Sequence, residues 1–253
     1  GYRTSKYPKE QINLYKRFRG LPQVDPKCDP VVAKRCAEAC PQDCIDAANC
    51  KIDLGRCVFC GLCETLSGGK FATFSQNFEM GAANRDDLFT TGTLPELADH
   101  AKKHFKKLFG RSLQLRQISA GGCNGCEADT NVLNTPFFDL SRFGIQFVAS
   151  PRHADGIHVT GPITKNMRAA TITTLEAVPS TKVVIASGAF AISGGHFYGS
   201  AENRGDLNSN HPHHFFLPVC TPPPLHTPHA LLNYLTNLST APFIYCLFNT
   251  LSP

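Results

Sequence analysis

Residues 113–126, Leu-Gln-Leu-Arg-Gln-Ile-Ser-Ala-Gly-Gly-Cys-Asn-Gly-Cys, place a strand-forming segment directly before a Cys-x2-Cys pair. Leu113 and Leu115 begin an apolar pattern that is typical of a strand with a buried face. The glycines that follow allow the backbone to pass close to a bulky cofactor. Ligands of open parallel sheets lie beyond the carboxyl ends of the strands, so the sequence predicts a binding site at Cys123 and Cys126.

The C-terminal half of the chain alternates strand-like and helix-like segments. Strands that alternate with helices indicate a parallel, doubly wound α/β sheet. The polar residues 201–214 predict a loop. The predicted strands cover residues 113–119, 143–149, 156–160, 182–186 and 215–219, and the predicted helices cover residues 166–176 and 229–238.

The chain divides by composition into four segments. A basic, partly helical lead-in precedes a cysteine-rich region whose many turn residues suit a small domain that folds around metal. A helix bounded by Pro95 and Gly110 then connects this region to the α/β domain. The four segments are residues 1–25, 26–90, 91–110 and 111–253.

Composition excludes some classes of function. A formal net charge of +5 over 253 residues is too small to indicate nucleic-acid binding, and no aromatic residues interleave with the basic ones. The basic residues of 3–19 and 102–107 either form solvated faces or dock to an acidic partner or to anionic headgroups. No segment approaches the about 20 apolar residues of a membrane span, and no secretory signal is visible.

The 12 cysteines group at metal-ligand spacings, which favours a reducing cytosolic compartment over a disulfide scaffold. Cys57, Cys60 and Cys63 form a Cys-x2-Cys-x2-Cys run, and Cys40 precedes Pro41 upstream of it. In ferredoxin-type folds, such a run and a remote Cys-Pro together hold one [4Fe–4S] cluster. A zinc site made of the same four cysteines is the alternative.

A second cluster of the ferredoxin type would need cysteines where this chain has Ala33 and Ser67. In that second ligand set, only Cys36 stands where the ferredoxin pattern has a cysteine, and Cys28 lies near it in the sequence. These two cysteines are therefore the weaker candidate ligands. The sequence therefore favours one N-terminal cluster, with the second site degraded. Cys44 and Cys50 lie nearby in the sequence. They either supply ligands for a second cluster or remain thiols that bind no metal.

Cys220 follows the last predicted strand and precedes a proline-rich turn. It can therefore project into the same crevice as the Cys-x2-Cys pair and complete a three-cysteine cluster site, although a buried thiol is the alternative. Cys246 lies in an apolar run and is expected to be a buried thiol. Three histidines in the polar loop are expected to face solvent: His211, His213 and His214.

Four segments resemble the small subunit of membrane-bound, complex I-like [NiFe] hydrogenases, the group that includes formate hydrogenlyase and the CO-linked and ferredoxin-linked energy-converting hydrogenases. Residues 19–87, which begin Arg-Gly-Leu-Pro-Gln-Val-Asp-Pro, are similar to the ferredoxin-like subunit of the same complexes. The chain thus looks like a fusion of the two. The four segments are residues 111–117, 123–127, 143–155 and 159–167.

This resemblance implies a ferredoxin-like iron–sulfur domain followed by a flavodoxin-like, doubly wound parallel sheet. It also implies a proximal [4Fe–4S] cluster at Cys123, Cys126 and Cys220. The family's third ligand falls in the segment Gly188-Ala-Phe190-Ala191, and Phe190 cannot ligate iron. The proximal cluster is then incomplete, takes another ligand or is absent.

The resemblance assigns roles to residues around the proximal site. The split Cys-x2-Cys pair favours the hydrogenase branch over the quinone-reducing complex I branch. Glu127 is either a proton relay or a surface carboxylate. Arg152, His153 and Asp155 either line the mouth of the crevice or form a structural ion pair.

The implied function is that of an electron-transfer subunit of an oxidoreductase, which passes electrons through [4Fe–4S] clusters to or from a NiFe centre in a large partner subunit. Other partners would be complex I-like and membrane subunits and an upstream electron donor. The expected location is peripheral, on the cytoplasmic side of the inner membrane. The alternatives are a structural or electron-wiring subunit of a complex I-like assembly with a degraded cluster site, and a zinc-stabilised interaction module.

Overall fold

The computed structural model describes residues 4–7, 9–10, 14–90, 112–179, 182–203, 215–220 and 223–238. The predicted connecting helix at 91–110 lies outside the described residues, as do His211, His213, His214 and Cys246.

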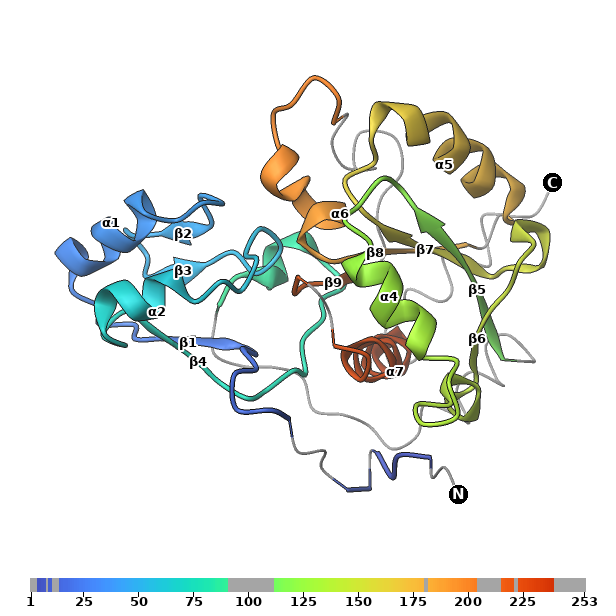
Figure 1. Ribbon diagram of the computed structural model, residues 1–253, viewed down its shortest axis with the longest axis horizontal. Coiled ribbons are helices and arrows are strands. Elements are labelled where there is room, and N and C mark those ends of the chain that lie inside the picture. Colours follow the sequence, from blue (N-terminus) through green and yellow to red (C-terminus); the bar gives the residue numbers. More distant parts are fainter. Residues whose placement is uncertain are drawn as a thin grey trace.

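The C-terminal half of the described chain is built on a five-stranded sheet in which every neighbouring pair is parallel. The strand order β6-β5-β7-β8-β9 corresponds to the order 2-1-3-4-5 of flavodoxin-like folds (Figure 1). The predicted parallel α/β sheet is therefore confirmed. The strands are β5 (Leu113–Ser119), β6 (Ile145–Phe147), β7 (Gly156–Thr160), β8 (Val183–Ser187) and β9 (Phe215–Leu217).

Helices cover both faces of this sheet. Leu113 and Leu115 pack on one face with residues of α7 (His226–Leu238) and with Leu133, which ends α4 (Gly125–Val132). The opposite face packs against α5 (Lys165–Ala177) through a second apolar cluster. Both predicted helices are present. The structure adds α4, α6 (Ala189–Ser193) and the short 3-10 helices η2 (Leu140–Phe143), η3 (Pro151–His153) and η4 (Gly195–Phe197).

The N-terminal half contains two short antiparallel strand pairs and two helices in the order β-α-β-β-α-β. Asp29 caps the first helix by accepting a hydrogen bond from the Val31 amide, and Pro30 suits its first turn. Left-handed glycines bound the second helix. The elements are β1 (Pro22–Val24), α1 (Pro30–Glu38), β2 (Ile45–Asp46), β3 (Lys51–Ile52), α2 (Leu62–Ser67), β4 (Ala72–Phe74) and η1 (Arg85–Leu88).

The two halves share an apolar core. Ala82 forms an antiparallel bridge with Phe216 of β9, so the N-terminal half extends the free edge of the sheet. Ile52, Leu88 and Ala186 lie in the same apolar cluster as these two residues. In Figure 1 the blue-to-cyan N-terminal elements accordingly lie beside the end of the sheet formed by β9 and α6.

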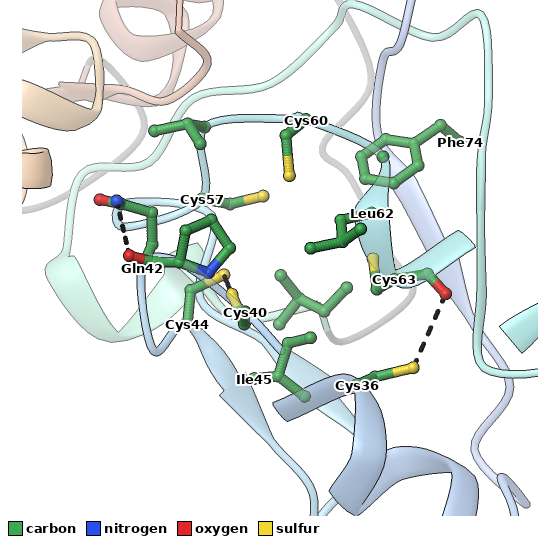
Figure 2. A pocket seen from close by; sticks show the side chains of 14 residues that line it. Cys36, Cys40, Gln42, Cys44, Ile45, Cys57, Cys60, Leu62, Cys63 and Phe74 are labelled. Carbon is green, nitrogen blue, oxygen red and sulfur yellow. Dashed lines mark hydrogen bonds between the residues drawn. The ribbon is translucent and has the colours of Figure 1, made fainter. Parts of the chain in front are cut away.

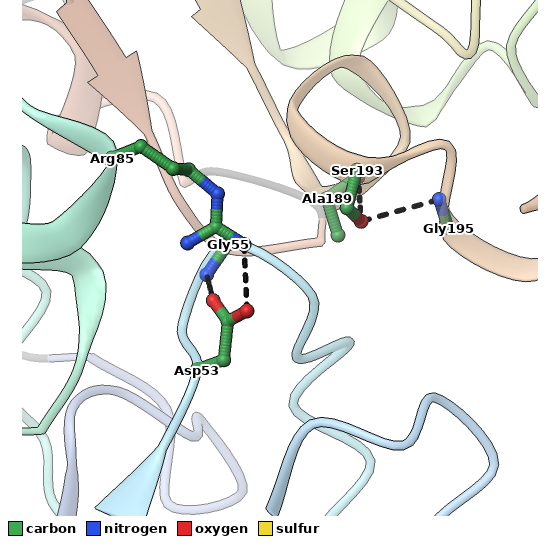
Figure 3. A network of polar contacts seen from close by, with 6 residues as sticks. All are labelled: Asp53, Gly55, Arg85, Ala189, Ser193 and Gly195. Carbon is green, nitrogen blue, oxygen red and sulfur yellow. Dashed lines mark hydrogen bonds and ion pairs between the residues drawn. The ribbon is translucent and has the colours of Figure 1, made fainter. Parts of the chain in front are cut away.

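An ion pair within the N-terminal half lies beside this junction. Arg85 Nη2 donates to Asp53 Oδ2 at 2.6 Å, and the Gly55 amide donates to the other carboxylate oxygen (Figure 3). A Cβ atom on Gly55 would lie 2.8 Å from Cγ2 of Ile192 in α6. The junction between the halves is therefore close packed.

The described part of the predicted lead-in packs against the α/β half. The Ser5 amide donates to the Phe137 carbonyl, and Arg142 donates to both Ser5 oxygens. Tyr7 is buried and donates or accepts a 2.7 Å hydrogen bond with His229 Nδ1 in α7. These contacts join the start of the chain to the C-terminal core.

Candidate metal centre

Six cysteines line one pocket in the N-terminal half (Figure 2). All four predicted ligands of the N-terminal cluster are among them, and the sulfurs of Cys57 and Cys60 point into the pocket in Figure 2. The other lining side chains are mostly apolar, which limits access of water. The cysteines are Cys36, Cys40, Cys44, Cys57, Cys60 and Cys63, and the apolar residues are Pro41, Ile45, Ile52, Val58, Leu62 and Phe74.

Backbone conformation turns the Cys-x2-Cys-x2-Cys run around the pocket. Phe59 has φ +55° and Gly61 has φ +76°, so the chain curls twice within a few residues. The Phe59 amide donates to Cys57 Sγ at 3.4 Å. Positive φ at a bulky aromatic residue is an outlier that tends to occur at functional sites. Amides turned toward sulfur in this way suit a bound metal–sulfur group.

The thiols of this pocket are shifted toward their protonated forms. Burial raises the pKa of Cys63 to about 11. The hydrogen bond with Cys44 and burial both raise the pKa of Cys40. Protons occupy these sulfurs in the absence of a cation, and a soft metal that binds there displaces them. The donor chemistry of the pocket fits an iron–sulfur cluster, which is held by cysteine thiolates.

The weaker candidate ligands lie in different surroundings. Cys36 lines the pocket, but its thiol donates to the Cys63 carbonyl at 3.6 Å. Cys28 and Cys50 form a disulfide, and a sulfur in a disulfide is not a thiolate ligand. The expectation that the cysteines are clustered thiols without disulfides is therefore wrong for this pair, because the turn before β3 brings Cys50 against the residues that precede α1.

Three cysteines meet at the carboxyl edge of the parallel sheet. Cys123 and Cys126 follow β5, and Cys220 follows β9. Burial raises the pKa of Cys126, and the nearby thiols of Cys220 and Cys123 raise it further. Burial, and then Cys123, raises the pKa of Cys220 to about 11. The structure thus brings together the three predicted ligands of the C-terminal site, as the position beyond the strand ends predicts.

The loop after β8 lies beside this site but supplies no cysteine to it. A Cβ atom on Gly188 would lie 2.7 Å from Cys126 Sγ, so this loop approaches Cys126 closely. Phe190 is 8% exposed and its ring packs against His196 and Phe197. The position of the family's third ligand is therefore occupied by an apolar side chain.

Strained backbone positions the C-terminal cysteines. Val219 has φ +95° and Asn124 has φ +67°, each directly beside a cysteine. For a β-branched, buried residue such as Val219 this conformation is a clear outlier. Surrounding structure must hold such residues in place, at a cost of about 1–3 kcal/mol each.

Two glycines allow the loop before Cys123 to approach the loop after β7. A Cβ atom on Gly161, which has φ +83°, would lie 2.5 Å from the Gly122 amide nitrogen. We expect Gly161→Ala to lower the free energy of unfolding by about 3 kcal/mol, through strain at positive φ and overpacking against backbone. Gly199→Ala is the matched control, because Gly199 has φ +77° with no atom within 4 Å. Urea denaturation should show a smaller loss, about 1 kcal/mol, for the control; equal losses would contradict this account.

Two expectations for neighbouring residues need correction. Glu127 is 6% exposed, so the surface-carboxylate alternative is wrong. Its Oε1 accepts hydrogen bonds from Ser119 Oγ at 2.8 Å and Thr160 Oγ1 at 2.6 Å. Asp155 does not lie at the mouth of the crevice, because its carboxylate accepts the Gln114 amide at the amino end of the sheet. The crossover from β6 returns to that end before β7 begins.

Two further observations apply to the described residues. No group of three or more His, Cys, Asp and Glu side chains among them is placed to hold a single metal ion. Within the same part of the chain, no helix combines the length and the apolar character of a membrane span.

Residues 123–234 match the family model of the NADH ubiquinone oxidoreductase 20 Kd subunit. The chain is 37% identical over 133 residues to the probable membrane-bound hydrogenase subunit mbhJ of Pyrococcus furiosus, covering 53% of this chain and 80% of that protein. It is 36% identical over 148 residues to formate hydrogenlyase subunit 7 of Escherichia coli, covering 58% of each. It is 36% identical over 140 residues to an NADH-quinone oxidoreductase subunit of Geobacter metallireducens, covering 54% of this chain and 75% of that one.

The chain, whose parallel sheet carries cysteines at its carboxyl edge, is thus similar to subunits of both membrane-bound hydrogenase and NADH-quinone oxidoreductase. The chain belongs to the NADH ubiquinone oxidoreductase 20 Kd subunit family. Its relatives are subunits of oxidoreductase complexes. The family match begins at Cys123, so it does not include the N-terminal pocket.

Proposed function

We propose that this chain is an electron-transfer iron–sulfur subunit of a membrane-associated, complex I-like [NiFe] hydrogenase. The observation that carries the proposal is the gathering of seven cysteines into two sites, one in each half. Iron–sulfur clusters supply one-electron transfer when they are bound by cysteine thiolates. The seven are Cys40, Cys57, Cys60 and Cys63 in the N-terminal pocket, and Cys123, Cys126 and Cys220 at the sheet edge.

The N-terminal half acts in this proposal as a ferredoxin-like domain. Its β-α-β-β-α-β order, with β1 paired to β4 and β2 paired to β3, supports that assignment. Cys40 comes from the loop after α1, whereas the other three ligands lie in or before α2. The lining is largely apolar and Cys60 is exposed, and exposure of the sulfurs to water is one of the factors that set a cluster's reduction potential.

Contacts across the junction link the two sites. Gln42, buried beside Cys40, hydrogen-bonds His196 Nδ1. The His196 ring packs at 5.9 Å from the Phe190 ring, and Phe190 lies two residues after the glycine that contacts Cys126. A continuous set of packed residues therefore runs from one site to the other, and it supports passage of electrons between them.

The partners follow from the relatives. A protein related to subunits of membrane-bound hydrogenase and formate hydrogenlyase would dock beside a large subunit that holds the NiFe centre, where H2 chemistry occurs. Glu127, buried against Thr160 beside the cysteines, would be the proton relay in this proposal. We place the chain as a peripheral subunit on the cytoplasmic side of the inner membrane.

One observation favours a second candidate function. Phe190 removes a ligand from the C-terminal site, which suits a structural or electron-wiring subunit of a complex I-like assembly, one that no longer serves a hydrogenase. In that case the N-terminal cluster remains and the C-terminal site is empty.

Iron and acid-labile sulfide per anaerobically prepared chain, with EPR after dithionite reduction, distinguish these functions. We expect more iron than the about four atoms of a single cluster, and two reduced centres that interact. About four irons and a single centre would favour the wiring subunit. Bound zinc without visible absorption would reject both and favour a zinc-stabilised interaction module.

A further inference from the structure

The N-terminal pocket contains more thiols than one cluster needs. A [4Fe–4S] cluster takes four cysteines, whereas six line this pocket. The ferredoxin spacing accounts for Cys40, Cys57, Cys60 and Cys63, so Cys36 and Cys44 remain. The Cys36 thiol is occupied by a hydrogen bond to the Cys63 carbonyl, at the rim drawn in Figure 2.

Cys44 differs from Cys36 because it lies against the sulfurs of two predicted ligands. Its Sγ is 3.4 Å from Cys40 Sγ (Figure 2), and its thiol also interacts with that of Cys57. The side chain is 6% exposed. Cys44 is therefore a buried thiol at the corner of the site that Cys40 occupies.

The backbone holds Cys44 firmly in this position. The turn at Asp43, which has φ +45°, directs the chain back toward Cys40. The Cys44 carbonyl accepts the Asp53 amide at 2.8 Å, and the next residue, Ile45, pairs with Ile52. Placement directly before a paired strand makes the thiol part of the rigid framework of the site.

We propose that Cys44 is an alternative ligand for the cluster corner assigned to Cys40. In the exchange, the Cys44 thiol gives its proton to solvent and forms an Fe–S bond, the Fe–S bond to Cys40 breaks, and Cys40 takes up a proton. No electron is transferred in this step. Retention of the cluster then does not depend on Cys40 alone. This inference rests on the proposed function, because it requires an iron–sulfur cluster in the N-terminal pocket.

The test compares the full chain with Cys40→Ala, Cys44→Ala, the double variant and Cys36→Ala, all prepared anaerobically. Alanine is used because a serine oxygen can itself bind iron. We expect each single variant to retain the N-terminal iron and the double variant to lose about four atoms. In the iron-loaded Cys40→Ala variant, alkylation in urea at a concentration that unfolds the metal-free chain, followed by mass spectrometry, should find Cys44 protected, whereas the same treatment after removal of the iron should modify it.

The outcomes separate this inference from the function on which it rests. If Cys40→Ala loses as much iron as the double variant while the wild type is loaded, the alternative ligand is rejected and the proposed cluster stands. If Cys40→Ala retains iron but Cys44 is as reactive as in the metal-free chain, the inference is also rejected. A wild type without N-terminal iron rejects the cluster itself, and the inference with it.

Discussion

Replacing Phe190 with cysteine is expected to raise the iron that the chain retains after a chelator challenge from about four atoms to about eight. The wild-type C-terminal site has three thiols, at Cys123, Cys126 and Cys220, and Phe190 supplies no fourth donor. A fourth thiolate would complete the set that holds a [4Fe–4S] cluster. Iron and sulfide analysis before and after the challenge measures the change, and after the challenge EPR should show a second reduced centre in the variant but a single one in the wild type.

Phe197→Cys is the matched control for this prediction. Phe197 packs on the Phe190 ring in the same segment but is 50% exposed. A cysteine there adds a thiol without adding a ligand at the sheet edge, so we expect no gain in retained iron. An equal gain in both variants would show that the extra iron is bound non-specifically. No gain in either would mean that the loop after β8 does not present residue 190 to the cysteines.

The sheet of this protein is largely predictable from sequence because its strands are apolar runs bounded by turns. Strands β5 and β7 begin and end where the pattern predicts. The helix α4 escapes prediction because it is short and begins inside the Cys-x2-Cys turn at the left-handed Asn124. The helix α6 has only 5 residues, too few for a helical periodicity to be visible in the sequence.

The candidate sites are predictable only in part, since spacing identifies ligand sets but not three-dimensional neighbours. The grouping of Cys40 with the run at 57–63 follows from a known spacing. The approach of Cys44 to Cys40 depends on the turn at Asp43, and the pairing of Cys28 with Cys50 depends on the hairpin that carries Cys50 back. The predicted position of Asp155 is wrong because this residue directly precedes β7 and so lies at the amino end of the sheet, beside Gln114 of β5.

The second large effect expected is a loss of stability in mild acid. Burial lowers the pKa of His158 and of His226 to about 4, from an ordinary value near 6.5, and burial lowers that of His229 to about 4 as well. Between pH 4 and pH 6.5, the folded state therefore binds fewer protons than the unfolded state. Stability is therefore complete above pH 6.5 and falls as the pH drops toward 4, by up to about 3 kcal/mol for each histidine.

The neighbours of these histidines determine how much of that loss is realised. Among the described residues, neither ring nitrogen of His158 has a hydrogen-bond partner, and the buried Glu127 favours its charged form. Around His229, Glu79 lies 3.4 Å from Nδ1 and Tyr7 shares that atom, so a proton there is better tolerated. Burial raises the pKa of Glu79, which offsets the loss at the acid end because the folded state then takes up that proton more readily.

His158→Leu isolates one of these contributions. The leucine removes a buried polar ring whose nitrogens make no hydrogen bond within the described part of the chain, so we expect the free energy of unfolding at pH 7 to rise by about 1–2 kcal/mol. The decline in the free energy of unfolding between pH 6.5 and 4 should become shallower, by the slope that corresponds to about one bound proton. Urea midpoints measured across that pH range give this slope. His153→Leu is the control, because His153 is exposed and should leave the slope unchanged. An unchanged slope in His158→Leu would mean that the ring is already protonated in the folded state, with Glu127 as its counter-ion.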